Sequence, residues 1–294
     1  MTAPGESSLD VGPEYGGFPP PIPTGRPTPA RCYDYGLGGK DNFAVDRQLV
    51  IDAAQQWPGN LDLARHNRRF LYRAVRFLAR DAGIGQFLDL GSGLPTQNNV
   101  HEVAQAFQPD ARVVYVDNDP IVLAHGRALL ADDQSTTVID ADMTRPDEVL
   151  DHEETQRLID FDQPLGILLF GVPHCIADES AVRRMIDGPM ARAVAGSYVA
   201  FSHVASDSRE DADALTAFYT ERGMEWRTRV PAEIEPWFSE LEVVEPGLGP
   251  VRQWRPDPDQ PPLAEVDEPL RPFVGTSEDN NAIYEFGGVL RKPV

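Results

Sequence analysis

Two turns, each at the end of a short apolar run, carry the residues of this sequence that are best suited to chemistry. The first is Asp89-Leu90-Gly91-Ser92-Gly93, and the second begins at Asp117, 26 positions after Gly91. Glycine lets the backbone turn sharply and lets a ligand approach where a Cβ would clash. A carboxylate at the end of the neighbouring strand can accept hydrogen bonds from both hydroxyls of a ribose. Together the two turns predict a pocket for an adenosine-containing cofactor.

The details of the glycine turn distinguish two kinds of adenosine cofactor. A dinucleotide site has the pattern G-x-G-x-x-G, but Thr96 stands at the third glycine position. Asp89 would repel a pyrophosphate, because like charges repel at short range, whereas it suits a ligand with an ammonium group. S-adenosylmethionine has an ammonium and a sulfonium group and no phosphate. The turn therefore favours S-adenosylmethionine. The alternative is an ordinary strand–turn–helix unit in which Asp89 caps a helix or has a structural role.

Polar residues also follow the next two predicted strands. The run 137–139 leads into Asp140-Ala141-Asp142-Met143. In a doubly wound sheet that binds an adenosine cofactor, the loop after the third strand lies beside the adenine. Asp142 could accept from the adenine amino group and Met143 could pack on the ring. The alternative is a polar turn that starts a helix at 145–148, and both can hold. The run 166–170 leads into Gly171-Val172-Pro173. Methyltransferases that act on the planar amino groups of bases or amides often have Asp/Asn-Pro-Pro-Tyr/Phe at this position, so its absence here argues against such an acceptor.

His174 and His203 are the candidate catalytic residues, because they lie at the ends of the fourth and fifth predicted strands, on the expected substrate side. Either imidazole could act as a general base. A His174–Cys175 nucleophile pair is disfavoured, because adjacent residues tend to point apart and no third group has a suitable spacing. The six histidines show no ligand spacing such as H-x-x-x-H, so no metal site is predicted.

Apolar runs and helical periods define the elements that must position these residues. Strands are expected at 87–90, 113–117, 137–139, 166–170 and 197–201, with a helix at 100–107. Residues 281–290 predict an antiparallel last strand with a bulge or break at Gly287-Gly288. Helices at 41–56 and 61–80 precede the first strand, and Asn60 can cap the second of them. Strands that alternate with helices in this way predict an α/β, doubly wound sheet.

Several blocks of the chain resemble the actinobacterial S-adenosyl methyltransferase family, long classed as a domain of unknown function. The blocks are residues 30–43, 67–68, 87–96, 116–120, 140–144, 170–178, 246–248 and 254–256. They span nearly the whole chain from about residue 26. The resemblance implies a Rossmann-like class I methyltransferase fold: a seven-stranded, mostly parallel sheet with an antiparallel last strand and an N-terminal helical cover. It implies S-adenosylmethionine as cofactor, S-adenosylhomocysteine as product, and Asn118 and Phe170 as further cofactor-binding residues. It implies no methyl acceptor.

The family-specific block at 37–43 could form a cover over the cofactor. The rings of Tyr33, Tyr35 and Phe43 can shield a sulfonium by cation–π contact, and the glycines of the block allow closure. The alternative is a turn that leads into a helix and carries packed aromatic residues. With the resemblance, we assign four residues of this region to cofactor binding: Tyr33, Gly38, Lys40 and Asn42.

The composition of the chain indicates its domain organisation and disfavours nucleic-acid-binding and membrane-spanning proteins. We expect a loosely ordered arm at 1–25, a helical cap at 26–83, and a methyltransferase domain at 84–294 with a proline-rich loop or lid at 256–272. The net charge of −21 disfavours nucleic acid, whose binders usually present basic surfaces. No apolar run approaches the roughly 18 residues of a membrane span. With two cysteines and no secretory signal, we expect a cytoplasmic protein. The oligomeric state is left open.

The sequence thus predicts methyl transfer from S-adenosylmethionine to a small molecule, with oxygen and nitrogen acceptors both open. The donor is already activated, so the protein chiefly aligns the reactants and excludes water. One alternative is a non-catalytic sensor or partner module, in which Tyr33, Tyr35 or the 256–272 loop would fill the substrate space. Another is an NAD-dependent reductase, which Asp89 and Thr96 disfavour.

Overall fold

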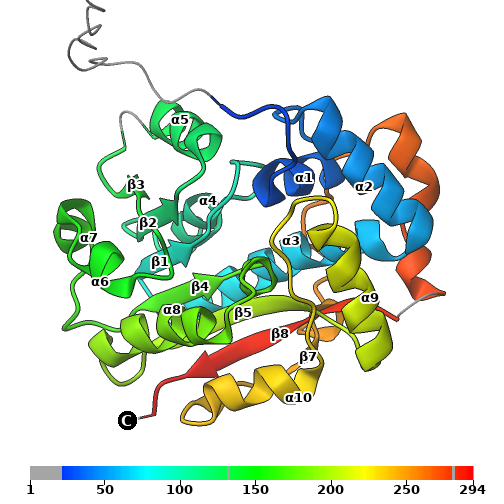
Figure 1. The fold of residues 1–294 in the computed structure, drawn as a ribbon. Coiled ribbons are helices and arrows are strands. Elements are labelled where there is room, and N and C mark those ends of the chain that lie inside the picture. The colour runs from blue at the N-terminus through cyan, green and yellow to red at the C-terminus, as the bar shows by residue number, and fades with distance from the viewer. Residues whose placement is uncertain (1–21, 131–132, 280–281, 294) are drawn as a thin grey trace, which may run out of the picture.

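The central strands are short runs of Val, Leu, Ile and Phe, which pack well on a sheet that is buried on both faces. The computed structural model of the protein describes residues 22–130, 133–279 and 282–293, and in it these runs lie side by side (Figure 1). Residues 1–21 of the predicted arm, and Asn281 of the predicted last strand, lie outside the described residues. No helix within the described ranges has both the length and the apolar character to cross a membrane.

The sheet has the order β3-β2-β1-β4-β5-β8-β6, and β1 to β5 run parallel. β8 is antiparallel to β5 and pairs with the two-residue strands β6 and β7. The predicted mostly parallel sheet with an antiparallel last strand is confirmed. The described residues form eight strands rather than seven, because β6 and β7 both pair with β8. The strands are β1 Gln86–Leu90, β2 Arg112–Asp117, β3 Thr136–Asp140, β4 Gly166–Leu169, β5 Tyr198–Ala205, β6 Glu242–Val243, β7 Gly249–Pro250 and β8 Tyr284–Arg291.

The predicted bulge at Gly287-Gly288 is wrong, because β8 runs through both glycines with continuous pairing to β5. These positions need glycine because neighbouring backbone comes close. A Cβ on Gly287 would lie 2.1 Å from the carbonyl oxygen of Phe201. A Cβ on Gly288 would lie 2.7 Å from Leu248, next to β7. The missing side chains therefore let β5 and the β7 segment pack closely on β8.

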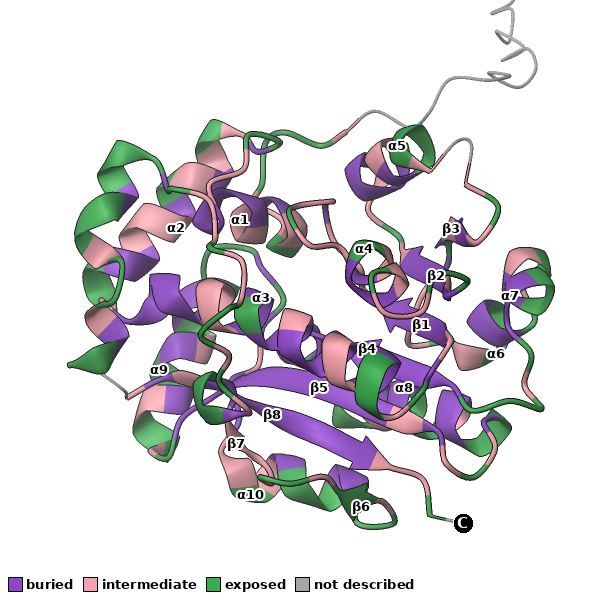
Figure 2. Ribbon diagram, turned by 180° about the vertical axis from the view of Figure 1, so that it is seen from behind, coloured by how far each residue is buried: buried purple, intermediate pink, exposed green. Residues whose placement is uncertain are grey.

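Helices cover both faces of the sheet, so that its strands are buried while the outer sides of the helices are exposed (Figure 2). Successive residues of a strand point to opposite faces. Phe87 accordingly packs with α3 and α4, whereas Leu88 and Leu90 pack with α6, α7 and α8 on the other face. The helices are α1 Pro29–Gly36, α2 Ala44–Gln56, α3 Asn60–Arg76, α4 Val100–Gln105, α5 Pro120–Leu129, α6 Pro146–Leu150, α7 Glu153–Leu158, α8 Glu179–Arg192, α9 Arg209–Thr220 and α10 Pro231–Ile234.

Helix α3 precedes the sheet in the sequence and contributes directly to the core. Its residues Phe70, Leu71 and Val75 belong to the same apolar cluster as Phe87 of β1. The predicted cap at Asn60 is wrong, because the helix already includes this residue and begins after Gly59. The Asn60 Oδ1 atom instead accepts a hydrogen bond from the Tyr219 hydroxyl at 3.1 Å. α3 thus joins the N-terminal helices to both the sheet and α9.

Arginines of α3 hold the C-terminal loops against the helix. The Arg73 guanidinium donates to the carbonyl oxygens of Trp254 at 2.8 Å and Val251 at 2.6 Å, and Arg76 pairs with Asp257. Part of the predicted 256–272 loop is an element, because Glu268–Phe273 form a 3-10 helix. Leu270 of this helix packs in a small apolar cluster with residues of α1 and α3. The segment is therefore packed on the body of the protein.

Candidate functional site

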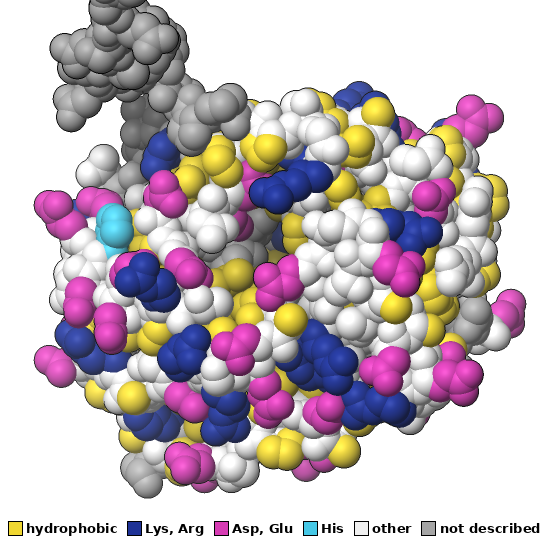
Figure 3. Space-filling model, in the orientation of Figure 1, with side chains coloured by type: hydrophobic (Ala, Val, Ile, Leu, Met, Phe, Trp, Pro, Cys, Tyr) yellow, Lys and Arg dark blue, Asp and Glu magenta, His cyan; other side chains and the backbone are white. Residues whose placement is uncertain are grey.

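A cavity of about 580 Å³ lies at the carboxyl ends of the parallel strands, where the strand order reverses between β1 and β4. Doubly wound sheets bind their ligands at this position. The residues that follow β1, β2 and β4 line the cavity on one side, and α1 and α3 line it on the other. A recess is visible on the molecular surface between α5 and the pair α1 and α2 (Figure 3). The volume falls within the roughly 300–1,000 Å³ of small-molecule sites.

Backbone hydrogen bonds hold the glycine turn after β1 in the cavity wall. The amides of Gly91 and Ser92 donate to the carbonyl oxygen of Val116, at 2.8 and 3.1 Å. Gly91 has a φ of +75°, and a Cβ on it would lie 2.6 Å from Val172. The conformation and the close approach both favour glycine. The predicted residues Gly91, Ser92 and Gly93 all line the cavity.

Asp117 connects the second turn to the first. Its Oδ2 atom accepts from the Gly93 amide at 2.9 Å, and Oδ1 accepts from the amides of Asn118 and Asp119, each at 2.9 Å. Burial raises the pKa of this carboxyl, and the three amides partly oppose that effect. A carboxylate has about four lone-pair sites, so one remains for a ligand hydroxyl. Asp117 and Asn118 both line the cavity.

Asp89 presents a buried carboxyl to the cavity. The residue is 5% exposed, and its carboxyl accepts no hydrogen bond from the described residues. Burial raises the pKa of Asp89 to about 7, although the Arg68 guanidinium lowers it. A buried carboxyl without a hydrogen-bond donor is costly, and a cationic group of a ligand would remove that cost. The environment therefore fits the ammonium group of S-adenosylmethionine, as the glycine cradle and Asp117 fit its adenosine.

Two further predicted residues line the cavity and one does not. Met143 and Phe170 contribute to the lining, and Phe170 packs edge-on against Phe70 of α3, with ring centroids 5.6 Å apart. Asp142 lies outside the lining. Its Oδ1 atom accepts from the amide and the hydroxyl of Thr144, at 2.9 and 2.7 Å. The carboxyl thus stabilises its own turn, which is the alternative that the sequence left open.

Of the three rings predicted to cover the cofactor, Tyr33 alone lines the cavity. Tyr35 is buried in an apolar cluster with Leu61 and Leu270, and Phe43 packs beside Leu94 and Ile121. Both rings are packed in these clusters, because they do not lie on the side of α1 and its following turn that faces the cavity. A cation–π shield from all three rings therefore does not fit this structure.

Gly38, Lys40 and Asn42 also lie outside the cavity lining. A Cβ on Gly38 would lie 2.2 Å from the carbonyl oxygen of Glu265, so this glycine packs against the C-terminal loop. Lys40 is exposed, and Asn42 donates through Nδ2 to Asp34 at 2.8 Å. The block is thus folded as a packed turn between α1 and α2.

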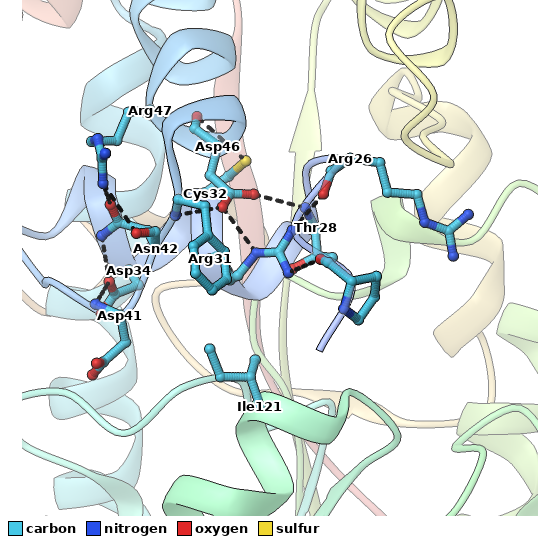
Figure 4. Close-up of polar contacts among 12 residues, drawn as sticks. Arg26, Thr28, Arg31, Cys32, Asp34, Asp41, Asn42, Asp46, Arg47 and Ile121 are labelled. Carbon is cyan, nitrogen blue, oxygen red and sulfur yellow. Dashed lines mark hydrogen bonds and ion pairs between the residues drawn. The ribbon is translucent and has the colours of Figure 1, made fainter. Parts of the chain in front are cut away.

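A buried ion pair fixes this turn (Figure 4). The Arg31 Nε donates to Asp46 Oδ2 at 2.9 Å, and both side chains have 0% exposure. The carboxylate of Asp46 also accepts from the amides of Thr28 at 3.1 Å and Phe43 at 2.8 Å. These bonds tie α1 to α2 and so determine where Tyr33 stands in the cavity wall.

A chain of hydrogen bonds joins Tyr33 to the sheet. Asn67 of α3 donates through Nδ2 to the Tyr33 hydroxyl at 3.0 Å. The Ser202 hydroxyl of β5 donates to Asn67 Oδ1 at 2.6 Å and accepts from the Gly171 amide at 2.7 Å. Burial raises the pKa of Tyr33, and both Glu285 and Asp89 add to the increase. Its hydroxyl therefore lies within electrostatic range of two buried carboxyls.

The two predicted bases differ in position, and neither is arranged to take a proton. His174 lines the cavity, but its Nδ1 accepts from the Val204 amide at 3.1 Å. Its other nitrogen then carries the proton, and burial lowers its pKa to about 3. His203 does not line the cavity. Its Nδ1 bonds the carbonyl oxygen of Val204 at 2.6 Å, and Nε2 bonds Arg229 at 3.0 Å. The described residues also bring no three His, Cys, Asp or Glu side chains together as a metal site would.

The cavity contains further residues that sequence reasoning missed. They are Asn60, Asn67, Arg68, Tyr219, Trp226 and Glu285. A signal existed for Asn67-Arg68, because residues 67–68 are one of the blocks in which the sequence resembles the family. Arg68 donates to the carbonyl oxygen of Gln97, at 3.0 Å from Nε and 2.8 Å from Nη2, and thereby holds the loop after the glycine turn. The other four had no local signal.

Comparison with known proteins agrees with the fold. A model of the S-adenosyl methyltransferase family matches residues 17–293. The chain belongs to the S-adenosyl methyltransferase family. A candidate methyltransferase from Thermobifida fusca YX is 42% identical with a TM-score of 0.79, over 92% of this chain and 96% of that one. A DUF574 family protein from Streptomyces avermitilis MA-4680 is 35% identical with a TM-score of 0.81, over 93% and 100%. A search of curated proteins gave no match.

Membership of the S-adenosyl methyltransferase family confirms the resemblance inferred from the sequence blocks. The match begins before the first described residue and extends through β8, so it includes α1 to α3 as well as the sheet. The two similar structures likewise cover almost the whole chain. The helices in front of the sheet are therefore part of the family's common structure.

Proposed function

We propose that this protein transfers a methyl group from S-adenosylmethionine to the oxygen or nitrogen of a small molecule. The observation that carries the proposal is a cavity whose lining contains two groups of residues, which we name the donor end and the acceptor end. The donor end is lined by Asp89, Gly91 and Asp117. The acceptor end continues past Tyr33 to Tyr219, Trp226 and Glu285.

The residues of the donor end fit the proposed cofactor. The carboxyl of Asp89 is positioned to pair with an ammonium group, and Asp117 to accept from a ribose hydroxyl. Met143 and Phe170 offer apolar surface to the adenine and to the methylthio part of the ligand. When bound, S-adenosylmethionine supplies an electrophilic methyl group, and its C–S bond breaks with the electron pair on sulfur. The chain's own part is to hold donor and acceptor in line and to exclude water.

The acceptor end supports an enzyme over a non-catalytic binder. A sensor has no need of space beside the methyl group, and the sequence suggested that Tyr33, Tyr35 or the 256–272 loop could fill it. Tyr35 and Leu270 pack elsewhere, and Tyr33 forms one wall. Figure 3 shows basic and acidic side chains interspersed over the face that carries the recess. That surface supports a small-molecule acceptor and no nucleic-acid partner.

Calorimetry with S-adenosylmethionine, S-adenosylhomocysteine and NAD tests the cofactor assignment. We expect the first two to bind and NAD not to bind. Asp89→Ala and Asp117→Ala should each weaken S-adenosylhomocysteine about tenfold or more, because a hydrogen bond to a charged group contributes roughly 1.5–3 kcal/mol. Asp187→Asn, at an exposed position on α8, is the matched control and should leave the affinity unchanged. Unchanged affinity in both site variants would place the cofactor elsewhere.

A further inference from the structure

Glu285 is a buried carboxyl in the acceptor end of the cavity. It is the second residue of β8 and pairs with Val204 of β5. It shares a strand face with Val289, which packs in the cluster formed with α3, because strand residues two apart point the same way. The residue is 3% exposed and lines the cavity together with Val204 and Cys175.

One of the two oxygens of the Glu285 carboxyl has no hydrogen-bond donor among the described residues. Its Oε2 atom is buried without a hydrogen bond to any group in the described ranges. The Ser202 hydroxyl lowers the pKa of Glu285 through a side-chain hydrogen bond, and it also contacts Asn67 Oδ1 at 2.6 Å. Burial raises the pKa of Glu285 to about 8. Buried polar groups in folded proteins are nearly always paired, so an unpaired one that lines a cavity points to a ligand.

The groups that face Glu285 supply no positive charge. Tyr33 of α1 and Cys175 after β4 lie within its electrostatic range, and burial raises the pKa of both, so they stay neutral. His174 is also neutral, because burial lowers its pKa to about 3. Arg68 lines the cavity too, but its guanidinium is bonded to Gln97 and Asn99 beside the donor end. The cation that would pair with Glu285 must therefore come from a ligand.

The walls around this carboxyl are apolar and aromatic. Tyr219 and Trp226 stack with ring centroids 4.1 Å apart, and Trp226 lies 4.3 Å from the His174 ring. Leu63 and Met224 complete the apolar lining. Asn60 also lines the cavity, and its Nδ2 atom is buried without a hydrogen bond to any residue that the structure describes. Aromatic faces together with a carboxylate are the surroundings in which proteins bind organic cations.

We propose that the acceptor end binds an amine with a compact apolar body, that the ammonium group pairs with Glu285, and that this carboxylate takes its proton. The proposal rests on the proposed methyl transfer and specifies its acceptor. An alcohol can form only a neutral hydrogen bond with this carboxyl, and an anionic acceptor would be repelled once the carboxyl ionises.

The proton step balances within these groups. An N–H bond of the ammonium breaks, its electron pair stays on nitrogen as a lone pair, and an O–H bond forms at Glu285. The free amine nitrogen can then form its bond to the methyl carbon. The product is again an ammonium, and Glu285 keeps its proton after the product leaves, until the next ammonium binds and the proton is released to solvent. The acceptor nitrogen is not nucleophilic while it is protonated, so a nearby proton acceptor is needed.

Calorimetry at saturating S-adenosylhomocysteine tests this assignment with matched probes. The amines are benzylamine, phenethylamine and butylamine, and each is compared with the alcohol and the carboxylate of the same skeleton. We expect amines to bind best and Glu285→Gln to weaken them about tenfold or more, since a charge-assisted bond is lost. Titration in phosphate and Tris at pH 7 should show release of about one proton per amine bound, because the carboxyl must ionise.

Controls separate this proposal from the proposed function. S-adenosylhomocysteine should bind Glu285→Gln as it binds the wild type, which also shows that the variant is folded. If Glu285→Gln does not fold, two other measurements test the assignment. These are the amine affinity of Glu285→Asp and the number of protons that the wild type releases when it binds an amine. The assignment is overturned if no amine binds, if alcohols or carboxylates bind better, or if amines bind the Gln variant equally well. Failure of the wild type to bind S-adenosylmethionine and S-adenosylhomocysteine would instead refute the methyl transfer itself.

Discussion

At the scale of single residues, the cavity joins two buried carboxyls that burial makes unusually weak acids. Burial raises the pKa of Asp89 to about 7 and that of Glu285 to about 8. Arg68 lowers the pKa of Asp89, whereas no arginine or lysine of the described residues does so for Glu285. Each carboxyl is therefore ready to ionise when a cationic group arrives. We propose that the ammonium group of the cofactor brings the positive charge to Asp89, and that the acceptor amine brings it to Glu285.

The first prediction concerns pH and cofactor affinity. Asp89 must be ionised to pair with an ammonium group, and its pKa in the free protein is about 7. S-adenosylhomocysteine affinity should therefore level off above pH 8 and fall toward tenfold per pH unit below about pH 6, the limit for one proton. Asp89→Asn should bind more weakly and flatten this profile. Calorimetry between pH 5.5 and 8.5 measures it, and an equally steep profile in the variant would contradict the role.

The second prediction concerns pH and stability. A carboxyl whose folded pKa is raised favours the folded state at low pH, and that contribution is lost as the pH rises from the unfolded value to the folded one. For Glu285 this window runs from about 4.5 to about 8. Glu285→Gln should therefore gain unfolding free energy relative to the wild type across this window, by up to a few kcal/mol at about 1.4 kcal/mol per pKa unit. Urea unfolding at pH 5 and pH 9 checks this, and the same difference at both values would contradict it.

At the scale of elements, the α1–α2 turn is held by charge and positions a cavity residue. Arg31 and Asp46 have side chains with no exposure. Arg31→Ala should cost about 3–5 kcal/mol, because it leaves an unpaired buried carboxylate. Arg80→Ala removes the exposed pair with Asp81 and should change the free energy of unfolding much less, because solvent screens exposed pairs. Urea unfolding compares the two. The Arg31 variant should also weaken S-adenosylhomocysteine, since α1 carries Tyr33, and equal costs for the two variants would contradict the argument.

The sequence was informative where the signal was local. A glycine turn that follows a buried run marks a strand end, and Asp89, Gly91 and Asp117 all line the cavity as expected. Asp142 and Asn42, which the sequence assigned to cofactor binding, instead bond Thr144 and Asp34 and lie outside the cavity lining. Glu285 gave no signal, because its place depends on β8 pairing beside β5. The same pairing explains Gly287, whose sequence context suggested a bulge.

At the scale of the whole molecule, the cavity is lined by residues from Pro23 to Glu285. The sequence suggested a helical cap at 26–83 and a methyltransferase domain at 84–294. In the structure, Phe70 and Val75 of α3 share a core cluster with Phe87 and Val113 of the sheet. A segment that supplies part of another segment's core is expected to unfold with it, because neither keeps its apolar burial alone. The arrangement thus predicts one cooperative unit.

Thermal unfolding with and without S-adenosylhomocysteine tests this prediction. A ligand that binds the folded chain at 100 times its Kd stabilises it by about 2.7 kcal/mol. Because α1 and α3 line the same cavity as the strand ends, the ligand should move one transition as a whole. The calorimetric and van 't Hoff enthalpies of that transition should agree. Two transitions, of which the ligand moves one, would mean that the helices before β1 form a separate domain. A single shifted transition would mean that the cofactor site and the helical cover fold as one structure.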